Sequence, residues 1–167
     1  MVGRNIASLE EAATRVREAA KASNDDNSQR IEVMKCEVSH ESDVEAAIAA
    51  VDTWGGVDVL FNNAGSVSED DGDATHVTDA AWDSTLATNL RGTFYGCKHA
   101  VLSFRRNGKT ATSVINNASI VALVGSAVPQ LAYTASKGGV LAMTRELAIV
   151  HAREGFRFNS LCPGPVR

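Results

Sequence analysis

The chain has few of the residues that mark secreted, metal-binding or nucleic-acid-binding proteins. It has only three cysteines, Cys36, Cys97 and Cys162, three prolines and 5% aromatic residues among 167. The cysteines are widely separated and show neither metal-ligand spacing nor a disulfide pattern, so we expect free, buried thiols. The formal net charge of −4 offers no basic face for nucleic acid. Secreted disulfide scaffolds and nucleic-acid-binding modules are therefore excluded.

Long hydrophobic runs and metal-ligand clusters are missing as well. No apolar run approaches the roughly 18 residues of a membrane span, and no signal-like segment follows Met1. We therefore expect a soluble, cytoplasmic protein without a membrane partner. The four histidines lack metal-ligand spacing, and the acidic stretch "SEDDGDATH" (68–76) lacks the closing glutamate of an EF-hand, so we expect no metal site. That acidic stretch is instead predicted to be a mobile loop beside a substrate cleft.

Helical and strand patterns alternate along the whole chain, without repeats or an evident linker. This alternation favours a single α/β domain over residues 1–167, with a parallel sheet covered by helices. Ser8 and Glu11 resemble a capping box at the start of the first helix, and Ser39 or Ser42 is expected to cap the second. The expected helices span 7–22, 39–54, 79–105 and 131–153, and the expected strands span 30–38, 57–65, 112–119 and 156–164.

The unusual polar clusters all follow predicted strands. "NNAG" (62–65), "NNAS" (116–119) and "CPGPV" (162–166) each close a strand, and Tyr133 opens the helix after "NNAS". Parallel α/β sheets bind ligands beyond the carboxyl ends of their strands. One crevice is therefore expected to collect the side chains of Asn63, Ser119, Tyr133, Lys137 and Val166.

Tyr133 and Lys137 are four residues apart and are expected to lie on one helix face, one turn apart. The Lys137 ammonium would favour tyrosinate over tyrosine, so that Tyr133 can exchange a proton with an alcohol or carbonyl oxygen. Ser119 would hold that oxygen by a hydrogen bond. A nicotinamide would supply or accept the hydride. The pattern thus indicates hydride transfer at a secondary alcohol or carbonyl.

These residues also carry a family resemblance: the chain resembles the short-chain dehydrogenase/reductase family, of the plain cytoplasmic type. The family's Tyr-x-x-x-Lys matches Tyr133 and Lys137, and its helix asparagine matches Asn89 in "TNLRG". Its Asn-Asn-Ala-Gly matches 62–65, its serine matches Ser119, and its Pro-Gly matches Pro163 and Gly164. The resemblance implies a Rossmann-like, doubly wound parallel sheet with helices on both faces, and association into homodimers or homotetramers through helices 85–105 and 131–152.

The resemblance implies a role for each matching residue. Tyr133 is the proton donor or acceptor, Lys137 also binds the nicotinamide ribose, and Ser119 orients the substrate oxygen. Asn89 bends its helix, and its carbonyl holds a water that links Lys137 to solvent. Ser119 lies one residue further from Tyr133 than in many relatives, which an insertion in "VGSAVPQ" (124–130) explains. The implied contacts with the cofactor involve Glu37 and Val38 at the adenine, Asn63, Ala64 and Gly65 along the dinucleotide, and Pro163, Gly164 and Val166 at the carboxamide end.

Cofactor preference depends on the first residues. Gly3 occupies the place of the acidic residue that binds the NAD ribose in the family, and Arg4 follows it. An arginine there suits the extra phosphate of NADP, so NADP is slightly favoured over NAD. The substrate is an alcohol or carbonyl compound, and the acidic loop argues mildly against anionic ones.

The glycine-rich Thr-Gly-x-x-x-Gly-x-Gly turn of the family is absent from the sequence. In the family this turn follows the first, central strand and binds the pyrophosphate at a helix N-terminus. The family's last strand is also absent, so the chain is expected to be the middle of a dehydrogenase, truncated at both ends. The alternative is a non-catalytic remnant that acts as an oligomerising or binding subunit. A receiver-like domain is disfavoured because no acidic pair follows a strand in the right place.

Overall fold

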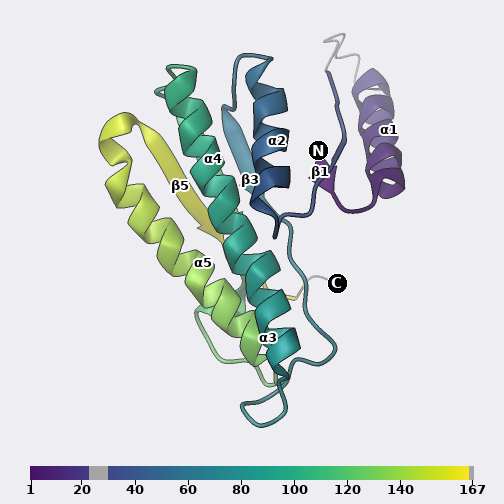
Figure 1. Cartoon of the computed structure of the whole chain (residues 1–167), viewed down its shortest axis with the longest axis vertical. Helices are drawn as coiled ribbons and strands as arrows, with labels where there is room; N and C mark the ends of the chain where they lie inside the picture. The colour runs from purple at the N-terminus through teal and green to yellow at the C-terminus, as the bar shows by residue number, and fades with distance from the viewer. Residues whose placement is uncertain (23–29, 166–167) are drawn as a thin grey trace.

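The computed structural model describes residues 1–22 and 30–165, which alternate between helices and strands as predicted (Figure 1). Val166, one of the predicted cofactor contacts, lies outside the described residues. The elements are β1 (Val2–Gly3), α1 (Ile6–Ala22), β2 (Met34–Lys35), α2 (Glu41–Asp52), β3 (Val59–Asn62), α3 (Asp79–Leu86), η1 (Ala87–Arg91), α4 (Gly92–Arg106), β4 (Thr112–Asn117), η2 (Ile120–Ala122), α5 (Leu131–Val150), η3 (Ala152–Glu154) and β5 (Phe156–Leu161).

The described strands form two separate parallel sheets. β1 pairs with β2, and the second sheet has the order β3-β4-β5. Helices connect successive strands, as parallel pairing requires. The chain therefore has the predicted α/β fold, in which the carboxyl ends of β3, β4 and β5 meet at one edge.

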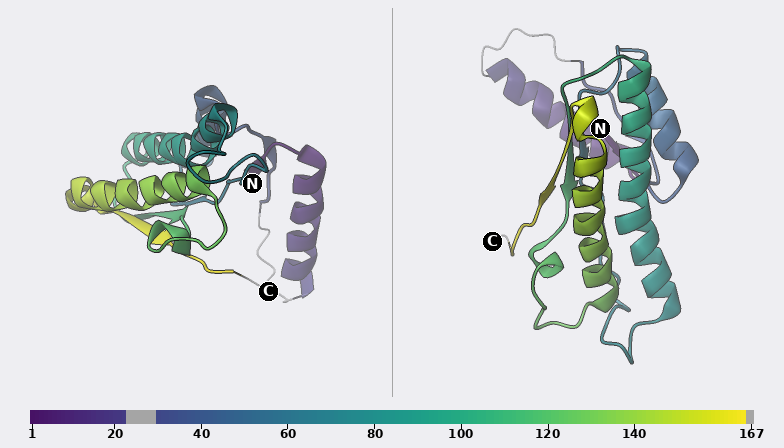
Figure 2. Two further views of the ribbon diagram at one scale, coloured as in Figure 1. Left: turned by 90° about the horizontal axis from the view of Figure 1, so that it is seen from below. Right: turned by 90° about the vertical axis from the view of Figure 1, so that its left-hand side faces the viewer.

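The core lies between the three-stranded sheet and the helices α4 and α5. Phe104 of α4 packs against Phe156 of β5, with ring centroids 5.0 Å apart, and Val114 of the central strand is fully buried. Figure 2 shows α2, α4 and α5 on one side of the strands and α1 on the other. Beyond α1, the described residues leave part of the second face exposed: Val59 and Phe61 on β3 are 62% and 50% exposed.

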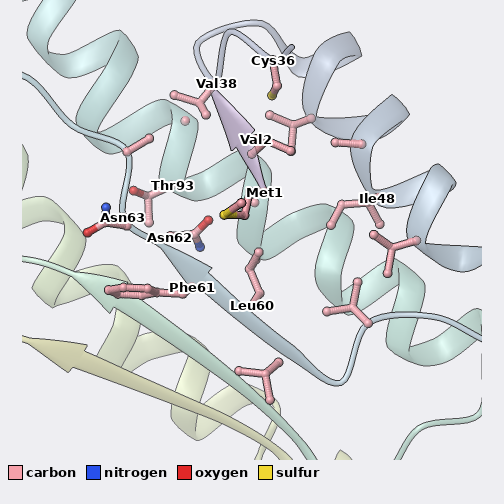
Figure 3. Close-up of a pocket in the computed structure, with 18 of the residues that line it drawn as sticks. Met1, Val2, Cys36, Val38, Ile48, Leu60, Phe61, Asn62, Asn63 and Thr93 are labelled. Atoms are coloured by element: carbon pink, nitrogen blue, oxygen red, sulfur yellow. The ribbon is translucent and has the colours of Figure 1, made fainter. Parts of the chain in front are cut away.

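An apolar cavity of about 870 Å³ separates the two sheets. β1 and β3 are edge strands of their sheets, and both line this cavity together with α2 and α4. Figure 3 shows Val2, Ile48 and Leu60 around it, with Asn62, Asn63 and Thr93 at one end. The N–H and C=O groups along an edge strand need hydrogen-bond partners. A further strand between β1 and β3 would supply them, so the cavity is suited to hold another strand.

The ends of several elements differ from the predictions. The strand expected over 30–38 is reduced to Met34–Lys35, because its partner β1 contains only two residues. Ser8 does not cap the first helix: α1 begins at Ile6, and the Asn5 side chain accepts the Ser8 N–H at 3.2 Å. Neither Ser39 nor Ser42 is the N-cap of α2; His40 holds that position without a side-chain bond.

The long helix predicted over 79–105 is divided by a π-helical turn, η1. The Asn89 side chain, fully buried in this turn, bonds to the loop after β3 rather than to its own helix. Such turns bend a helix, as the family resemblance implies for this asparagine. No helix in the described part of the chain is long and apolar enough to cross a membrane.

Candidate active site

Tyr133 and Lys137 lie on the first two turns of α5, beside the end of β4. The Lys137 side chain is buried, with 4% of the residue exposed, and its Nζ donates a 2.6 Å hydrogen bond to the Asn117 carbonyl. Nζ also lies 5.5 Å from the centroid of the Tyr133 ring. Burial lowers the pKa of Lys137 below its ordinary value because the low-dielectric surroundings disfavour the ammonium.

Gly65, at the end of the "NNAG" segment, allows the loop after β3 to approach this lysine closely. A Cβ atom built on Gly65 would lie 3.4 Å from Lys137 Nζ and 3.3 Å from Asn89 Oδ1. The contact with Asn89 would be tight enough to force a small shift, whereas the contact with Lys137 would be an ordinary van der Waals contact. The glycine therefore lets the loop backbone lie close to the Lys137 ammonium with no side chain between them.

Asn89 connects the loop after β3 to α5. Its Oδ1 accepts the Ser66 N–H at 2.8 Å, and its Nδ2 donates to the Ser66 carbonyl at 2.8 Å and to Ser136 Oγ at 3.1 Å. Ser136 Oγ in turn donates to the Tyr133 carbonyl at 2.7 Å. The Asn89 carbonyl, for which the resemblance implies a water, accepts the Thr93 hydroxyl at 2.7 Å. The asparagine side chain thus fixes the loop relative to the helix that carries Tyr133.

A ladder of asparagines crosses the strand ends, and sequence reasoning missed most of it. Asn62 Nδ2 donates to Asn116 Oδ1, and Asn117 Nδ2 donates to Asn63 Oδ1, each at 2.9 Å. Asn62 and Asn116 are also register partners in the sheet. The repeated "NNA" at 62 and 116 was the available signal, since equal motifs at the ends of neighbouring parallel strands meet side by side. Asn117 joins the site because its carbonyl holds Lys137.

Ser119 is buried at the start of η2, where its Oγ accepts the Val121 N–H over a long 3.4 Å. The next amide, that of Ile120, donates to the Pro163 carbonyl at 3.0 Å, so the end of β5 is joined to the Ser119 turn. Gly164 follows in an exposed position. η2 packs against α5, which brings the Ser119 turn to the helix of Tyr133 and Lys137.

A second group follows the strands of the smaller sheet: Arg4 comes after β1, and Glu37 and Val38 come after β2. Arg4 Nε lies 3.8 Å from Glu37 Oε2, and the arginine side chain is 73% exposed. Val38 packs under Gly92 of α4, where an added Cβ would lie 3.0 Å from the Val38 carbonyl oxygen. Val38 lines the apolar cavity, as do Asn63 and Ala64 of the first group. The predicted site residues therefore fall into two groups with the cavity between them.

Lys137→Met removes a desolvated charge, which should stabilise the fold at pH 7 by about 1 kcal/mol. It also removes the donor of the hydrogen bond to the Asn117 carbonyl, which costs a similar amount, about 1 kcal/mol, at every pH. The folded-state pKa of Lys137 is lowered, so its cost is fully present below that pKa and is relieved as pH rises toward 10.5. The gain should therefore shrink between pH 7 and pH 10 in thermal unfolding. Exposed Lys35→Met is the control and should change little. A stability difference between Lys137→Met and the unchanged chain that is the same at pH 7 and pH 10 would contradict this account.

Comparison with known proteins identifies the family. Residues 4–167 match the family model described as enoyl-(acyl carrier protein) reductase. The chain is 35% identical over 98% of its length to 2-(R)-hydroxypropyl-CoM dehydrogenase of Xanthobacter autotrophicus, covering 65% of that protein. It is 33% identical over 95% of its length to levodione reductase of Leifsonia aquatica, covering 59% of that protein.

Solved structures agree with these sequence matches. A short-chain dehydrogenase/reductase from Burkholderia xenovorans superposes with a TM-score of 0.87 at 28% identity, covering 99% of this chain and 61% of that one. A variant of actinorhodin polyketide ketoreductase with NADPH superposes with a TM-score of 0.86 at 31% identity, over 99% of this chain and 60% of that one. The chain thus spans less than two thirds of each of these relatives, and it belongs to the short-chain dehydrogenase/reductase family of oxidoreductases.

Proposed function

We propose that the chain carries the acid–base half of an NAD(P)-dependent dehydrogenase that interconverts a secondary alcohol and a carbonyl. The observation that carries the proposal is Lys137, a lysine buried against the Asn117 carbonyl and beside the Tyr133 ring. Burial of a charge is costly, and shifted groups of this kind gather at functional sites. Family membership and the names of the relatives support the same reaction class.

The residues around Lys137 fit a nicotinamide ribose. Gly65 brings the backbone of the loop after β3 close to the ammonium without a side chain between them. Asn117 Oδ1 is buried with no hydrogen-bond partner among the described residues, so an acceptor is available close to the lysine. The surface beside Lys137 continues along the apolar cavity through Asn63, Ala64 and Val38, toward Arg4 and Glu37. When bound, a nicotinamide would supply or accept the hydride.

The chain's own residues have distinct roles in the proposed reaction. Tyr133 exchanges a proton with the substrate oxygen, and Ser119 Oγ holds that oxygen. The Lys137 ammonium stabilises the tyrosinate through the field it creates across the ring face and binds the ribose hydroxyls. Asn89 holds the loop that closes this space through Ser66. On the dinucleotide side, Pro163, Gly164 and Val166 would meet the carboxamide.

The cofactor preference stays with NADP. Arg4 is exposed and paired with Glu37 only at 3.8 Å, so its guanidinium is available for a phosphate. A relative of known structure was solved with NADPH.

We further propose that copies associate through α4 and α5, where Phe94, Ile149 and Val150 are 46%, 77% and 58% exposed. Association without catalysis is the alternative function, as an oligomerising or binding subunit.

The test is deuteride transfer by a grafted protein, in which residues 1–167 are completed with the parts of levodione reductase that lie outside the matched region. It is supplied with 4-deuterated NADPH and a panel of cyclic and open-chain ketones. We expect a product alcohol that carries one deuterium on its carbinol carbon, detected by mass spectrometry. Binding of NADPH without label transfer to any ketone would favour the non-catalytic subunit instead.

A further inference from the structure

The N-terminus of α5, which carries Tyr133 in its first turn, has no capping side chain of its own. The N-cap residue, Gln130, makes no side-chain bond to the helix, and the first turn contains no acidic residue. The first amides of any helix have no partner within the helix and need acceptors from elsewhere. The helix that positions the proposed acid–base residue therefore depends on another segment.

That segment is the acidic loop after β3. Asp71 Oδ1 accepts the Ala132 N–H at 3.0 Å, and Asp71 Oδ2 accepts the Tyr133 N–H at 2.9 Å. The preceding amide, that of Leu131, donates to the Gly72 carbonyl at 2.9 Å. Asp71 Oδ1 also accepts the Gly72 N–H at 2.9 Å, which fixes the carboxylate on its own loop. One carboxylate thus caps the helix, although Asp71 is 61 residues from Ala132 and 62 residues from Tyr133 in sequence.

The opposite end of the same loop is also fixed to α5. Ser66 exchanges two hydrogen bonds with Asn89, and Asn89 reaches the Tyr133 carbonyl through Ser136. The backbone of Tyr133 is therefore held on both sides: its N–H by Asp71 and its carbonyl by Ser136. A negative charge at a helix N-terminus is also favourable for the helix dipole.

We propose that Asp71 is a positioning residue that holds Tyr133 in place for proton transfer and couples the acidic loop to it. The proposal rests on the proposed function of Tyr133, but the placement of the ring can be measured separately. Asp71 does not touch the reacting atoms; it acts through the backbone of Tyr133. The acidic loop, which is predicted to border the substrate cleft, thus also helps to hold Tyr133 in position.

The test is NMR spectroscopy of residues 1–167 with labelled amides and tyrosine rings. In Asp71→Ala, we expect the amides of Ala132 and Tyr133 to exchange with solvent at least about fivefold faster, since a lost cap costs about 1 kcal/mol or more. The Tyr133 ring signals should shift, while those of Tyr95 on α4 stay unchanged. Asp71→Asn keeps one acceptor oxygen and should recover part of both effects.

Asp70→Ala is the matched control, because Asp70 is exposed and its carboxylate makes no hydrogen bond within the described residues. Unchanged exchange at Ala132 and Tyr133 in Asp71→Ala would overturn the proposal. So would an Asp70→Ala effect of equal size, or ring signals of Tyr133 that do not move. These results do not depend on catalysis: if Asp71→Ala behaves as expected and label transfer fails, the proposed function is wrong and the positioning role stands.

Discussion

NADPH is expected to bind the grafted protein at least about 100-fold more tightly than residues 1–167 alone, measured by the fluorescence of the bound nicotinamide. The family's glycine-rich turn presents backbone N–H groups and a helix N-terminus to the pyrophosphate. Hydrogen bonds to a charged group contribute roughly 1.5–3 kcal/mol each. Two such bonds correspond to about two to four orders of magnitude in the dissociation constant.

The apolar cavity explains why the graft should assemble in the right place. It lies between the edge strands β1 and β3 and is lined by aliphatic side chains of β3 and α2. A strand inserted there can pair with both edges and join the two sheets into one. The turn that follows such a strand would then emerge beside Asn63 and Ala64, at the carboxyl ends of the strands.

A graft with the strand but with alanines at the glycines of the turn separates the two effects. It should raise the unfolding temperature, because the cavity is filled, while leaving the affinity for NADPH near that of residues 1–167. The expectation would be refuted by submicromolar NADPH binding to residues 1–167, because the phosphate contacts would then come from residues already present.

The sequence predicted the parts of the fold that depend on local patterns. Alternating helices and strands indicated the α/β class. The polar motifs at strand ends led to the prediction that Asn63, Lys137 and their neighbours lie at one edge. Tyr133 and Lys137 are four residues apart on a helix, so their shared face follows from helix geometry alone. The relatives and their structures confirm the family and the fold class.

What the sequence could not predict depends on contacts between distant segments. The π-helical turn at Asn89 arises from side-chain bonds to Ser66, 23 residues away. Asp71 caps a helix 61 residues further along, and no local rule connects the two positions. The strand over 30–38 was predicted too long, because strand length depends on the partner and β1 offers only two residues. Sequence patterns report on residues that are close along the chain, whereas these features depend on residues that are close only in the folded structure.

Tyr133→Phe in the grafted protein is expected to lower kcat about 1,000-fold, within the range that general acid–base catalysis contributes. The dissociation constant of NADPH should stay within about twofold, because the contacts proposed for the cofactor involve Lys137 and the strand ends. The phenylalanine ring keeps the aromatic face that lies 5.5 Å from Lys137 Nζ, so the lysine should keep its place. Stopped-flow and steady-state kinetics measure the two quantities separately.

Tyr95→Phe is the matched control, since the chain has two tyrosines and Tyr95 packs on Phe94 of α4 with ring centroids 5.5 Å apart. It loses the same hydroxyl away from the proposed site and should leave kcat unchanged. If Tyr133→Phe retains more than about a tenth of the activity, another group moves the proton. The buried lysine would then be explained by cofactor binding alone, and the acid–base role would have to be sought in Ser119 or in a residue of the acidic loop.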